Sequence, residues 1–307
     1  MKFIKKDKIF EWTSPNDWWK SNTMAPSAIY WESKIRVFIG AWDEKPVSRI
    51  TYIDLDPVNP TKILKIKDDS PVLDVGAVGM FDDNGVFPGH VSIVDNKIYL
   101  YYTGFQTGVN VPHYNFGGLA ISDDGDNFKR VSKAPILDRS DEGLLVRAGQ
   151  SVIKDGDSYK STYSIGSEFA HVGGKLRPTY DVCFQESIDG INFKNSGNKI
   201  VSADRSVEHG LGRPQIIKLG NKFFTFYTRR MLDMKYFMGA ASSFDCVSWT
   251  KENDLFNRIK HSDDGFDSEM IYFPSVVYVP DTKKYLLFYS GNGFGKSGIG
   301  YCELLQD

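Results

Sequence analysis

The sequence predicts an all-β fold, a five-bladed β-propeller with four antiparallel strands in each blade. A short segment recurs five times along the 307 residues, and each copy is followed by a polar turn and a second stretch rich in Phe and Tyr. Measured between marker residues, the steps are 62, 60, 66 and 60 residues, which suits a propeller blade with generous loops. The markers are Pro26, Pro88, Ala148, Pro214 and Pro274.

Turn signals indicate the third strand of each blade. Asp124-Gly125 and Asp189-Gly190 each stand between two stretches of alternating polarity. Asp-Gly is a strong hairpin signal because the turn requires a positive φ. A weaker copy occupies residues 240–249, and a fourth, outer strand is expected after each, as from Lys129 onward. Each repeat is therefore predicted to form a four-stranded antiparallel sheet.

The two ends of the chain are predicted to share the last blade. The fifth repeat has only three strands of its own, because the chain ends soon after residues 298–303. Residues 3–12 read like the outer strands of the other repeats, so we expect them to pair beside residues 299–304 and close the ring. Closure of this kind leaves no exposed strand edge. We therefore expect one domain over residues 1–307.

The charge and composition of the chain argue against nucleic acid and membranes as partners. The formal net charge of −2 gives no basic footprint for nucleic acid and no polybasic patch for a membrane. The first residues contain no apolar stretch long enough for a signal peptide, so a cytoplasmic location is expected, with the oligomeric state left open. Cys183, Cys246 and Cys302 lack metal-type spacing and are expected to be reduced thiols. No metal and no cofactor are predicted.

Carboxylates stand just before the inner strands of four repeats. Inner strands of a propeller begin around one end of the central channel, so residues at these positions should converge there. Asp83 and Glu269 lie five residues before their marker prolines, and Glu208 lies six before its own. Paired carboxylates across a sugar are what glycoside cleavage requires. For such an enzyme we expect Glu208 as general acid, Asp83 as base or nucleophile, and Glu269 orienting the substrate or tuning Glu208.

Cationic, amide and aromatic side chains complete the predicted site. Two arginines open inner strands, and they either lock neighbouring acids or form a pocket for phosphate or an acidic sugar. Flat rings in the rim loops are candidates to pack on a sugar face. A further pair, Arg229-Arg230, is expected to be solvated or ion-paired, with contact to the pocket as the alternative. The predicted substrate-binding residues are Arg147, Arg213, His90, Gln150, Asp82, Trp19 and Phe105.

The whole chain resembles the five-bladed furanosidase-like superfamily, which includes arabinanases, xylosidases, invertases, levansucrases and mannoside phosphorylases (glycoside hydrolase families 43, 32, 68, 117 and 130). The resemblance rests on the five repeats, the predicted terminal closure, and the Ser-x-Asp-Gly-x-Asn-Phe turns at 122–128 and 187–193. It implies three channel-facing acidic residues that act as base or nucleophile, pKa modulator and general acid. Mannoside phosphorylases also use arginines to bind phosphate.

The chain departs from the superfamily at two motifs. Ala25 stands where invertases and arabinanases usually place Asp before the first marker proline, and Ala148-Gly149 replaces the Asp-Pro of the invertase Arg-Asp-Pro motif. Three functions stay open: an enzyme that cleaves a glycosidic bond, a cytosolic glycan-biosynthesis enzyme or phosphorylase acting on a phosphorylated or acidic sugar, and a non-catalytic carbohydrate-binding propeller. The sequence leaves the sugar and its linkage open.

Overall fold

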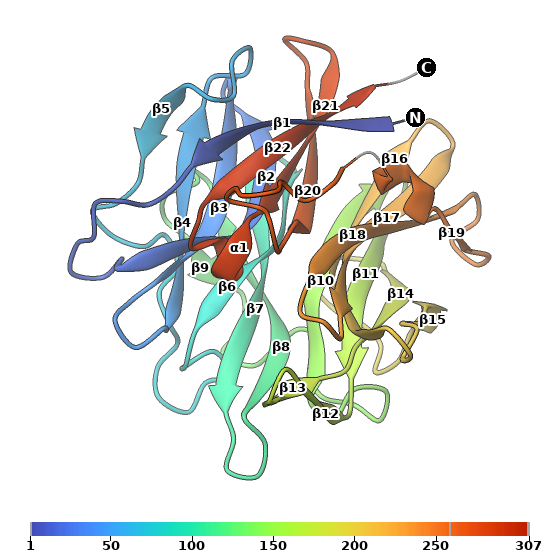
Figure 1. Cartoon of the computed structure of the whole chain (residues 1–307). Coiled ribbons are helices and arrows are strands. Elements are labelled where there is room, and N and C mark those ends of the chain that lie inside the picture. Colours follow the sequence, from blue (N-terminus) through green and yellow to red (C-terminus); the bar gives the residue numbers. More distant parts are fainter. Residues whose placement is uncertain (1, 258, 306–307) are drawn as a thin grey trace.

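The computed structural model describes residues 2–257 and 259–305. Strands dominate the described chain, with only a 3-10 turn, η1 (Asn253–Phe256), and a short helix, α1 (Asn292–Gly295). Figure 1 shows the strands gathered into several twisted sheets that stand beside one another. The all-β prediction is confirmed.

Two separate four-stranded sheets follow the chain order without crossovers. The first consists of β2 (Ser21–Trp31), β3 (Lys34–Trp42), β4 (Ser48–Leu55) and β5 (Ile63–Ile66). The second consists of β16 (Glu208–Leu219), β17 (Lys222–Met231), β18 (Tyr236–Ser243) and β19 (Thr250–Lys251). In both sheets every strand is antiparallel to the one before it, as the repeat pattern predicts.

Two further repeats form sheets that join through a short parallel contact between β8 and β10. The second repeat supplies β6 (Val86–Val94), β7 (Lys97–Thr107), β8 (His113–Ser122) and β9 (Lys129–Arg130). The third supplies β10 (Val146–Asp155), β11 (Ser158–Gly166), β14 (Asp181–Ser187) and β15 (Asn198–Val201). Between β11 and β14 the chain makes a separate hairpin of β12 (Phe169–Val172) and β13 (Lys175–Pro178).

The last sheet combines both ends of the chain. It contains β20 (Tyr272–Val279), β21 (Lys284–Ser290), β22 (Ile299–Leu305) and β1 (Lys2–Phe10). The first strand runs antiparallel to β22, with Phe3 opposite Leu304, and Figure 1 shows the two ends side by side. Lys5 also reaches the buried Asp267, with its Nζ 2.8 Å from the carboxylate. The predicted pairing of the N-terminal strand with residues 299–304 is confirmed.

The inner strand of each sheet is largely buried. β2, β6, β10, β16 and β20 are buried along most of their length, whereas β5, β15 and β19 at the outer edges are largely exposed. Side by side, β2 contacts β6 and β20, β10 contacts β6 and β16, and β16 contacts β20. Apolar side chains fill the spaces between sheets, as where Ile39 and Phe288 share one cluster. Burial of this apolar surface is the main source of stability.

Bulges interrupt four of these inner strands at equivalent places. Arg213 and Phe273 both adopt left-handed φ values there, 47° and 58°, where the strand pairing slips by one residue. The third repeat has Gly149 at this position, the residue type that tolerates such a φ best. A hydroxyl of a neighbouring sheet accepts each displaced N–H at 2.8–3.1 Å. The pairs are Gly149 with Thr103, Arg213 with Ser164, Phe273 with Thr228, and Ala25 with Ser290.

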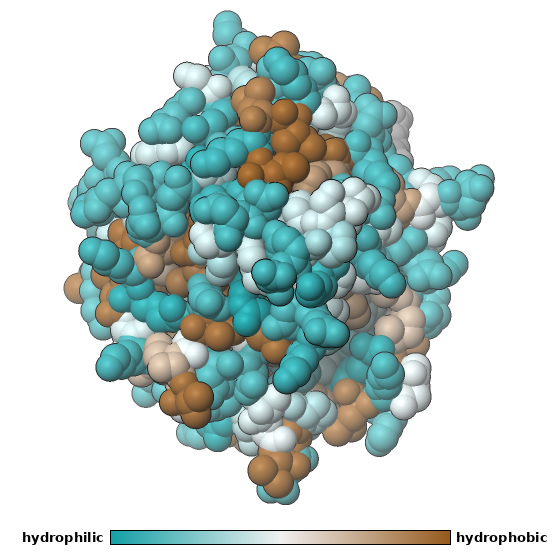
Figure 2. Space-filling view, turned by 90° about the vertical axis from the view of Figure 1, so that its left-hand side faces the viewer, coloured by the Kyte–Doolittle hydropathy of each residue, from teal (hydrophilic) through white to brown (hydrophobic). Residues whose placement is uncertain are grey.

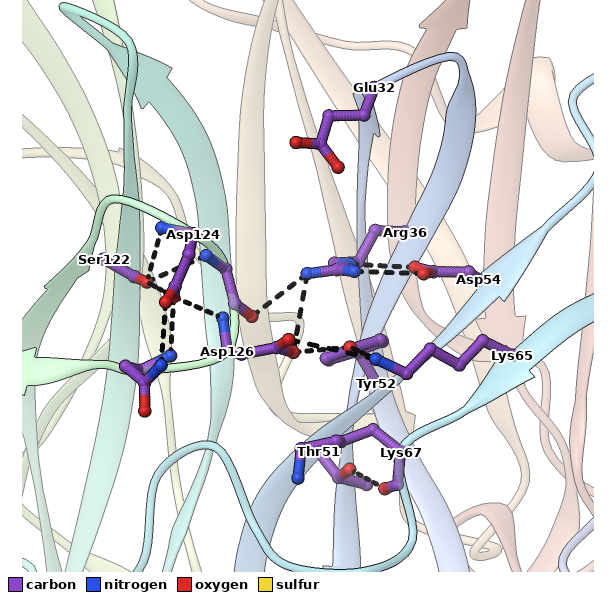
Figure 3. Close-up of polar contacts among 12 residues, drawn as sticks. Glu32, Arg36, Thr51, Tyr52, Asp54, Lys65, Lys67, Ser122, Asp124 and Asp126 are labelled. Atoms are coloured by element: carbon purple, nitrogen blue, oxygen red, sulfur yellow. Dashed lines mark hydrogen bonds and ion pairs between the residues drawn. The ribbon is translucent and has the colours of Figure 1, made fainter.

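A buried ion pair ties the first sheet to the turn that follows β8 (Figure 3). The Arg36 guanidinium donates to both carboxylate oxygens of Asp54, at 2.8 and 3.0 Å, and to the carbonyl of Gly125 at 3.1 Å. It also lies over the ring of Tyr52, 3.7 Å from the centroid. Asp124 accepts hydrogen bonds within the turn, including one from the Asn127 side chain, which holds the pKa of this carboxyl well below its usual range.

The surface is mainly hydrophilic. On the face that Figure 2 presents, hydrophobic residues gather in separate patches among hydrophilic ones. The large apolar side chains exposed to solvent include Val58, Val78 and Val109, which come from different loops. Within residues 2–257 and 259–305, no helix has the length and apolar character needed to cross a bilayer.

Candidate functional site

A cavity of about 330 Å³ lies where the inner strands begin. Each inner strand contributes at least one lining residue at or beside its repeat marker: Met24, Phe87, Ala148, Arg213 and Phe273. The side chains that line this cavity thus come from all five repeats. A cavity of this size can accommodate a small molecule.

Aromatic rings form much of the cavity wall. Phe87 lies between Phe105 and Phe273, with ring centroids 5.4 and 6.2 Å away. Trp42 stacks on Phe294 at 6.2 Å with an interplanar angle of 25°. Phe105 was predicted to contact a substrate, and it does line the cavity. Flat apolar walls of this kind suit the faces of a sugar ring.

Arg213 is one of the three described arginines that line the cavity. It is 4% exposed, and its guanidinium donates only to backbone carbonyls. Burial lowers the pKa of Arg213 to about 9, so the side chain still carries its charge at neutral pH. With every N–H engaged, Arg213 joins four inner strands. The accepting carbonyls belong to Pro88, Phe273, Pro274, Ala25 and Pro26, at 2.7–3.5 Å.

Arg230 lines the same cavity from the end of β17. Its guanidinium carbon lies 5.2 Å from the ring centroid of Tyr180, 5.3 Å from that of Tyr236 and 5.7 Å from that of Phe273. Its Nε is buried without a hydrogen-bond partner. Arg177, from β13, is the third arginine of the lining. No aspartate or glutamate among the described residues lines this cavity.

The histidines of this region are neutral at physiological pH. Burial, and then the charge of Arg230, lowers the pKa of His113 in the cavity wall to about 4. Burial, and then the charge of Arg213, lowers the pKa of His90 to about 3. The Nδ1 of His90 accepts a long hydrogen bond, 3.4 Å, from the N–H of Val152. The positive charge at the cavity therefore resides on its arginines.

The three predicted catalytic carboxylates lie outside the cavity lining. Asp83 accepts a hydrogen bond from the N–H of Gly79 in the loop before β6. Glu208 is 3% exposed and pairs with Arg229 at 2.5 Å. Glu269 is exposed ahead of β20. The expectation that the three converge with Arg147, Arg213 and His90 on one pocket is therefore not met at this cavity, where Arg213 alone of these six residues lines the wall.

Recurring carboxylates near these positions have a structural role. Asp82, a predicted substrate contact, lies outside the cavity lining, accepts from the hydroxyl of Tyr102 at 3.0 Å and pairs with Arg130 at 2.8 Å. Asp267 accepts from Tyr289 and pairs with Lys5. Glu142 accepts from Tyr163 and pairs with Arg147, each at 2.8 Å. Each carboxylate thus anchors the loop before an inner strand to a tyrosine of the second strand and to one cation.

Four other predicted contact residues are buried and lie outside the lining of this cavity. Arg147 is 2% exposed and held by Glu142 and two backbone carbonyls. Trp19 is fully buried and stacks on Trp12, with centroids 3.9 Å apart. Gln150 is 1% exposed and donates to Ser161. His90, also buried, holds the backbone as described above.

Sequence reasoning missed Arg177, and for Arg230 it favoured a solvated or ion-paired side chain over the alternative of contact with the pocket. Arg229 is ion-paired as expected, but its neighbour Arg230 points to the cavity because successive strand residues face opposite sides. That alternation is the sequence signal that could have separated the two. Within the described chain, no group of three or more His, Cys, Asp or Glu side chains is arranged to hold a metal ion. Cys183, Cys246 and Cys302 are buried free thiols.

Comparison with known proteins extends over the whole chain. No protein-family model matches it. The uncharacterized protein Rv1502 of Mycobacterium tuberculosis is 29% identical over 305 residues, which cover 99% of each chain.

Solved structures share the fold at low sequence identity. A thermostable family-43 glycoside hydrolase superposes with a TM-score of 0.71 at 17% identity, covering 96% of this chain and 94% of that one. A structure from the GH130 family of mannoside phosphorylases, which contains glycoside hydrolases that target β-1,2 mannosidic linkages in Candida mannan, gives 0.72 at 16% identity, covering 98% and 93%. The chain therefore has the propeller fold of these glycoside hydrolases, and the resemblance to the furanosidase-like superfamily is confirmed at the level of the fold.

Proposed function

We propose that the sheets of this chain are the five blades of one closed propeller and that residues 1–307 form a single domain. Two features support closure. β2 and β20 are in contact, and two hydroxyls of the last sheet, those of Ser275 and Ser290, accept from the N–H groups of Ala28 and Ala25 in β2. The pairing of β1 with β22 then covers the outer edge of the last blade.

The protein, in this proposal, is carbohydrate-active and binds its sugar in the cavity at the start of the inner strands. The observation that carries the proposal is the aromatic wall of Phe87, Phe105 and Phe273 at the place where all five repeats meet. Polar groups of Ser164, Asn84 and other lining residues could orient hydroxyls of the ligand. The glycoside hydrolase fold adds support from general similarity.

Phe105→Ala tests this site. Removal of the ring should weaken binding of a recognised mono- or oligosaccharide by about 10-fold, because packing against the sugar face is lost. Tyr278→Ala is the matched control, since Tyr278 is an exposed aromatic residue outside the cavity lining. Calorimetric titration of a sugar panel measures both. Equal affinities for the two variants and the unsubstituted protein would count against the cavity.

Hydrolysis is the second candidate function, favoured by the fold. In this case Glu208 would act as general acid, Asp83 as base or nucleophile, and Glu269 as an orienting residue. Glu208→Gln should then lower turnover of an aryl glycoside by about 10²–10⁴-fold. The composition of the cavity wall favours binding over this chemistry, because a carboxylate pair must flank the scissile bond. Full activity in Glu208→Gln would reject the assignment of the acid.

A further inference from the structure

The cavity carries positive charge that no carboxylate balances. Among the residues that the structure describes, neither Arg177 nor Arg230 forms an ion pair, and the only hydrogen bond of the Arg177 side chain goes to the carbonyl of Val172 at 3.2 Å. Elsewhere in the fold, buried cations pair with acids, as Arg36 does with Asp54 and Arg147 with Glu142. A guanidinium removed from water without a counter-charge is costly unless a ligand supplies that charge.

The two arginines are neighbours. The pKa of His209 is lowered to about 4, mainly by burial and further by the charges of Arg230 and Arg177. Both also act on the hydroxyl of Tyr180, whose pKa burial raises above its usual value. Both side chains line the same cavity, from β13 and β17, and the guanidinium carbon of Arg230 lies 5.2 Å from the ring centroid of Tyr180, another lining residue.

Arg230 differs from Arg213 in the donors it keeps. The guanidinium of Arg213 is saturated by the five backbone carbonyls that it joins, so it has no N–H left for a ligand. Arg230 is stacked among three aromatic rings instead, and its Nε has no hydrogen-bond partner. Ring faces hold the planar guanidinium in place but leave its edge available to a planar or tetrahedral anion.

We propose that the ligand of this cavity is an anionic sugar, one that carries a phosphate or a carboxylate group, and that Arg230 and Arg177 bind this group. The sugar part of the inference rests on the proposed function, whereas the anion part rests on the arginines alone. Arginine is suited to this task because its fork donates two parallel hydrogen bonds to a phosphate or carboxylate. The adjacent aromatic wall would then pack on the sugar ring.

Calorimetric titration with four probes tests the inference: inorganic phosphate, glucose 1-phosphate, glucuronate and glucose, in a buffer of low ionic strength. The unsubstituted protein should bind at least one anionic probe more tightly than glucose. Arg230→Met should weaken that binding by about 10- to 100-fold, the worth of charge-assisted hydrogen bonds. Arg177→Met should have a smaller effect, and Arg230→Lys should keep part of the affinity, because the charge remains without the fork.

Arg139→Met is the matched control. Arg139 also lies over aromatic rings, 4.5 Å from the centroid of Tyr114, but it is exposed and outside the cavity lining. This variant should bind the probes within about twofold of the unsubstituted protein. Thermal unfolding of each variant confirms that a change in affinity does not reflect loss of the fold.

The outcomes separate the two proposals. The anion site would be overturned if the unsubstituted protein bound glucose as tightly as the anionic probes, or if Arg230→Met bound an anionic probe as tightly as the unsubstituted protein does. The carbohydrate site would not be affected by either result. Binding of inorganic phosphate through Arg230 with no added affinity from a sugar would support the anion site and count against the carbohydrate proposal. Failure of all three anionic probes at millimolar concentration would overturn the inference. The tighter of glucose 1-phosphate and glucuronate identifies the anionic group.

Discussion

Arg36 and Arg230 have similar aromatic surroundings, yet Arg36 is paired with a carboxylate, whereas Arg230 forms no ion pair with a described residue. Both guanidinium groups lie over tyrosine rings, Arg36 at 3.7 Å from Tyr52 and Arg230 at 5.2 Å from Tyr180. Arg36 also makes two charge-assisted hydrogen bonds to Asp54 (Figure 3), whereas no described carboxylate pairs with Arg230. Arg36 thus connects the first sheet to the turn after β8, through Asp54 and the carbonyl of Gly125. Arg230, in our proposal, keeps its charge for a ligand.

The largest effect is expected at the paired arginine. Arg36→Met would leave Asp54, which is 1% exposed, with only Lys34 at 3.6 Å as a cationic neighbour. Loss of one partner of a buried ion pair costs about 3–5 kcal/mol of the free energy of unfolding. Urea denaturation measures the change. The double variant Arg36→Met with Asp54→Leu should recover part of the loss, and a double variant no more stable than Arg36→Met would contradict this account.

The second prediction concerns the recurring carboxylates. Glu142→Ala removes the partner of the buried Arg147 and the acceptor of the Tyr163 hydroxyl, so we expect a loss of about 2–3 kcal/mol in the free energy of unfolding. Glu269→Ala is the control, because Glu269 is exposed and should change stability by less than about 0.5 kcal/mol. Similar losses for both variants would show that the anchoring role is misassigned.

The repeated features of the fold could be predicted from the sequence, whereas the residues specific to the cavity could not. Repeats revealed the strands, the pairing of β1 with β22 and the meeting point of the inner strands, because these features depend on local patterns that each copy repeats. The same recurrence made the carboxylates look like a shared active site. A feature that recurs in several repeats is more readily explained by a structural need that these repeats share, since Asp82, Glu142 and Asp267 each accept a hydrogen bond from a tyrosine.

The features specific to the cavity are those that do not recur. Arg177 comes from the β12–β13 hairpin, which forms a separate two-stranded sheet, and Arg230 lies near the end of β17, the second strand of its repeat. Their convergence depends on the distance between β13 and β17 in space, and no spacing in the sequence encodes that distance. Trp19 illustrates the opposite error, because a tryptophan in a loop can be fully buried when the loop folds onto the core.

The third prediction concerns how the free energy of unfolding depends on pH, which should differ between the histidines near the cavity and the carboxylate of Asp124 near Arg36. Burial and the arginine charges lower the pKa of His113 to about 4, that of His209 to about 4 and that of His90 to about 3. In the unfolded chain these groups titrate near 6.5, so the unfolded state binds more protons below that pH. Stability should therefore fall as pH decreases from about 6.5 to about 4, by up to about 1.4 kcal/mol per pH unit for each histidine.

Asp124, in the turn beside Arg36, should not contribute over this range, because the pKa of its carboxyl is lowered and the stability that it adds is lost only in stronger acid. Urea denaturation at several pH values between about 7 and about 5 tests the point. His113→Gln should reduce the slope by about one proton, whereas Asp124→Asn should leave the slope unchanged. A slope that does not respond to His113→Gln would contradict the lowered pKa of this residue.

The smallest expected effect on stability is at Arg230, and it completes the comparison. Replacement of this partly buried cation, which has no acidic partner among the described residues, by an apolar side chain of similar length should be close to neutral, within about 1 kcal/mol, or should stabilise the protein, because no partner loses its counter-charge. Arg230→Met should also let the pKa of His113 rise toward its usual value, which would flatten the acid dependence described above. A large destabilisation, comparable to that of Arg36→Met, would mean that Arg230 holds the fold together and would remove the argument that its charge is kept for a ligand.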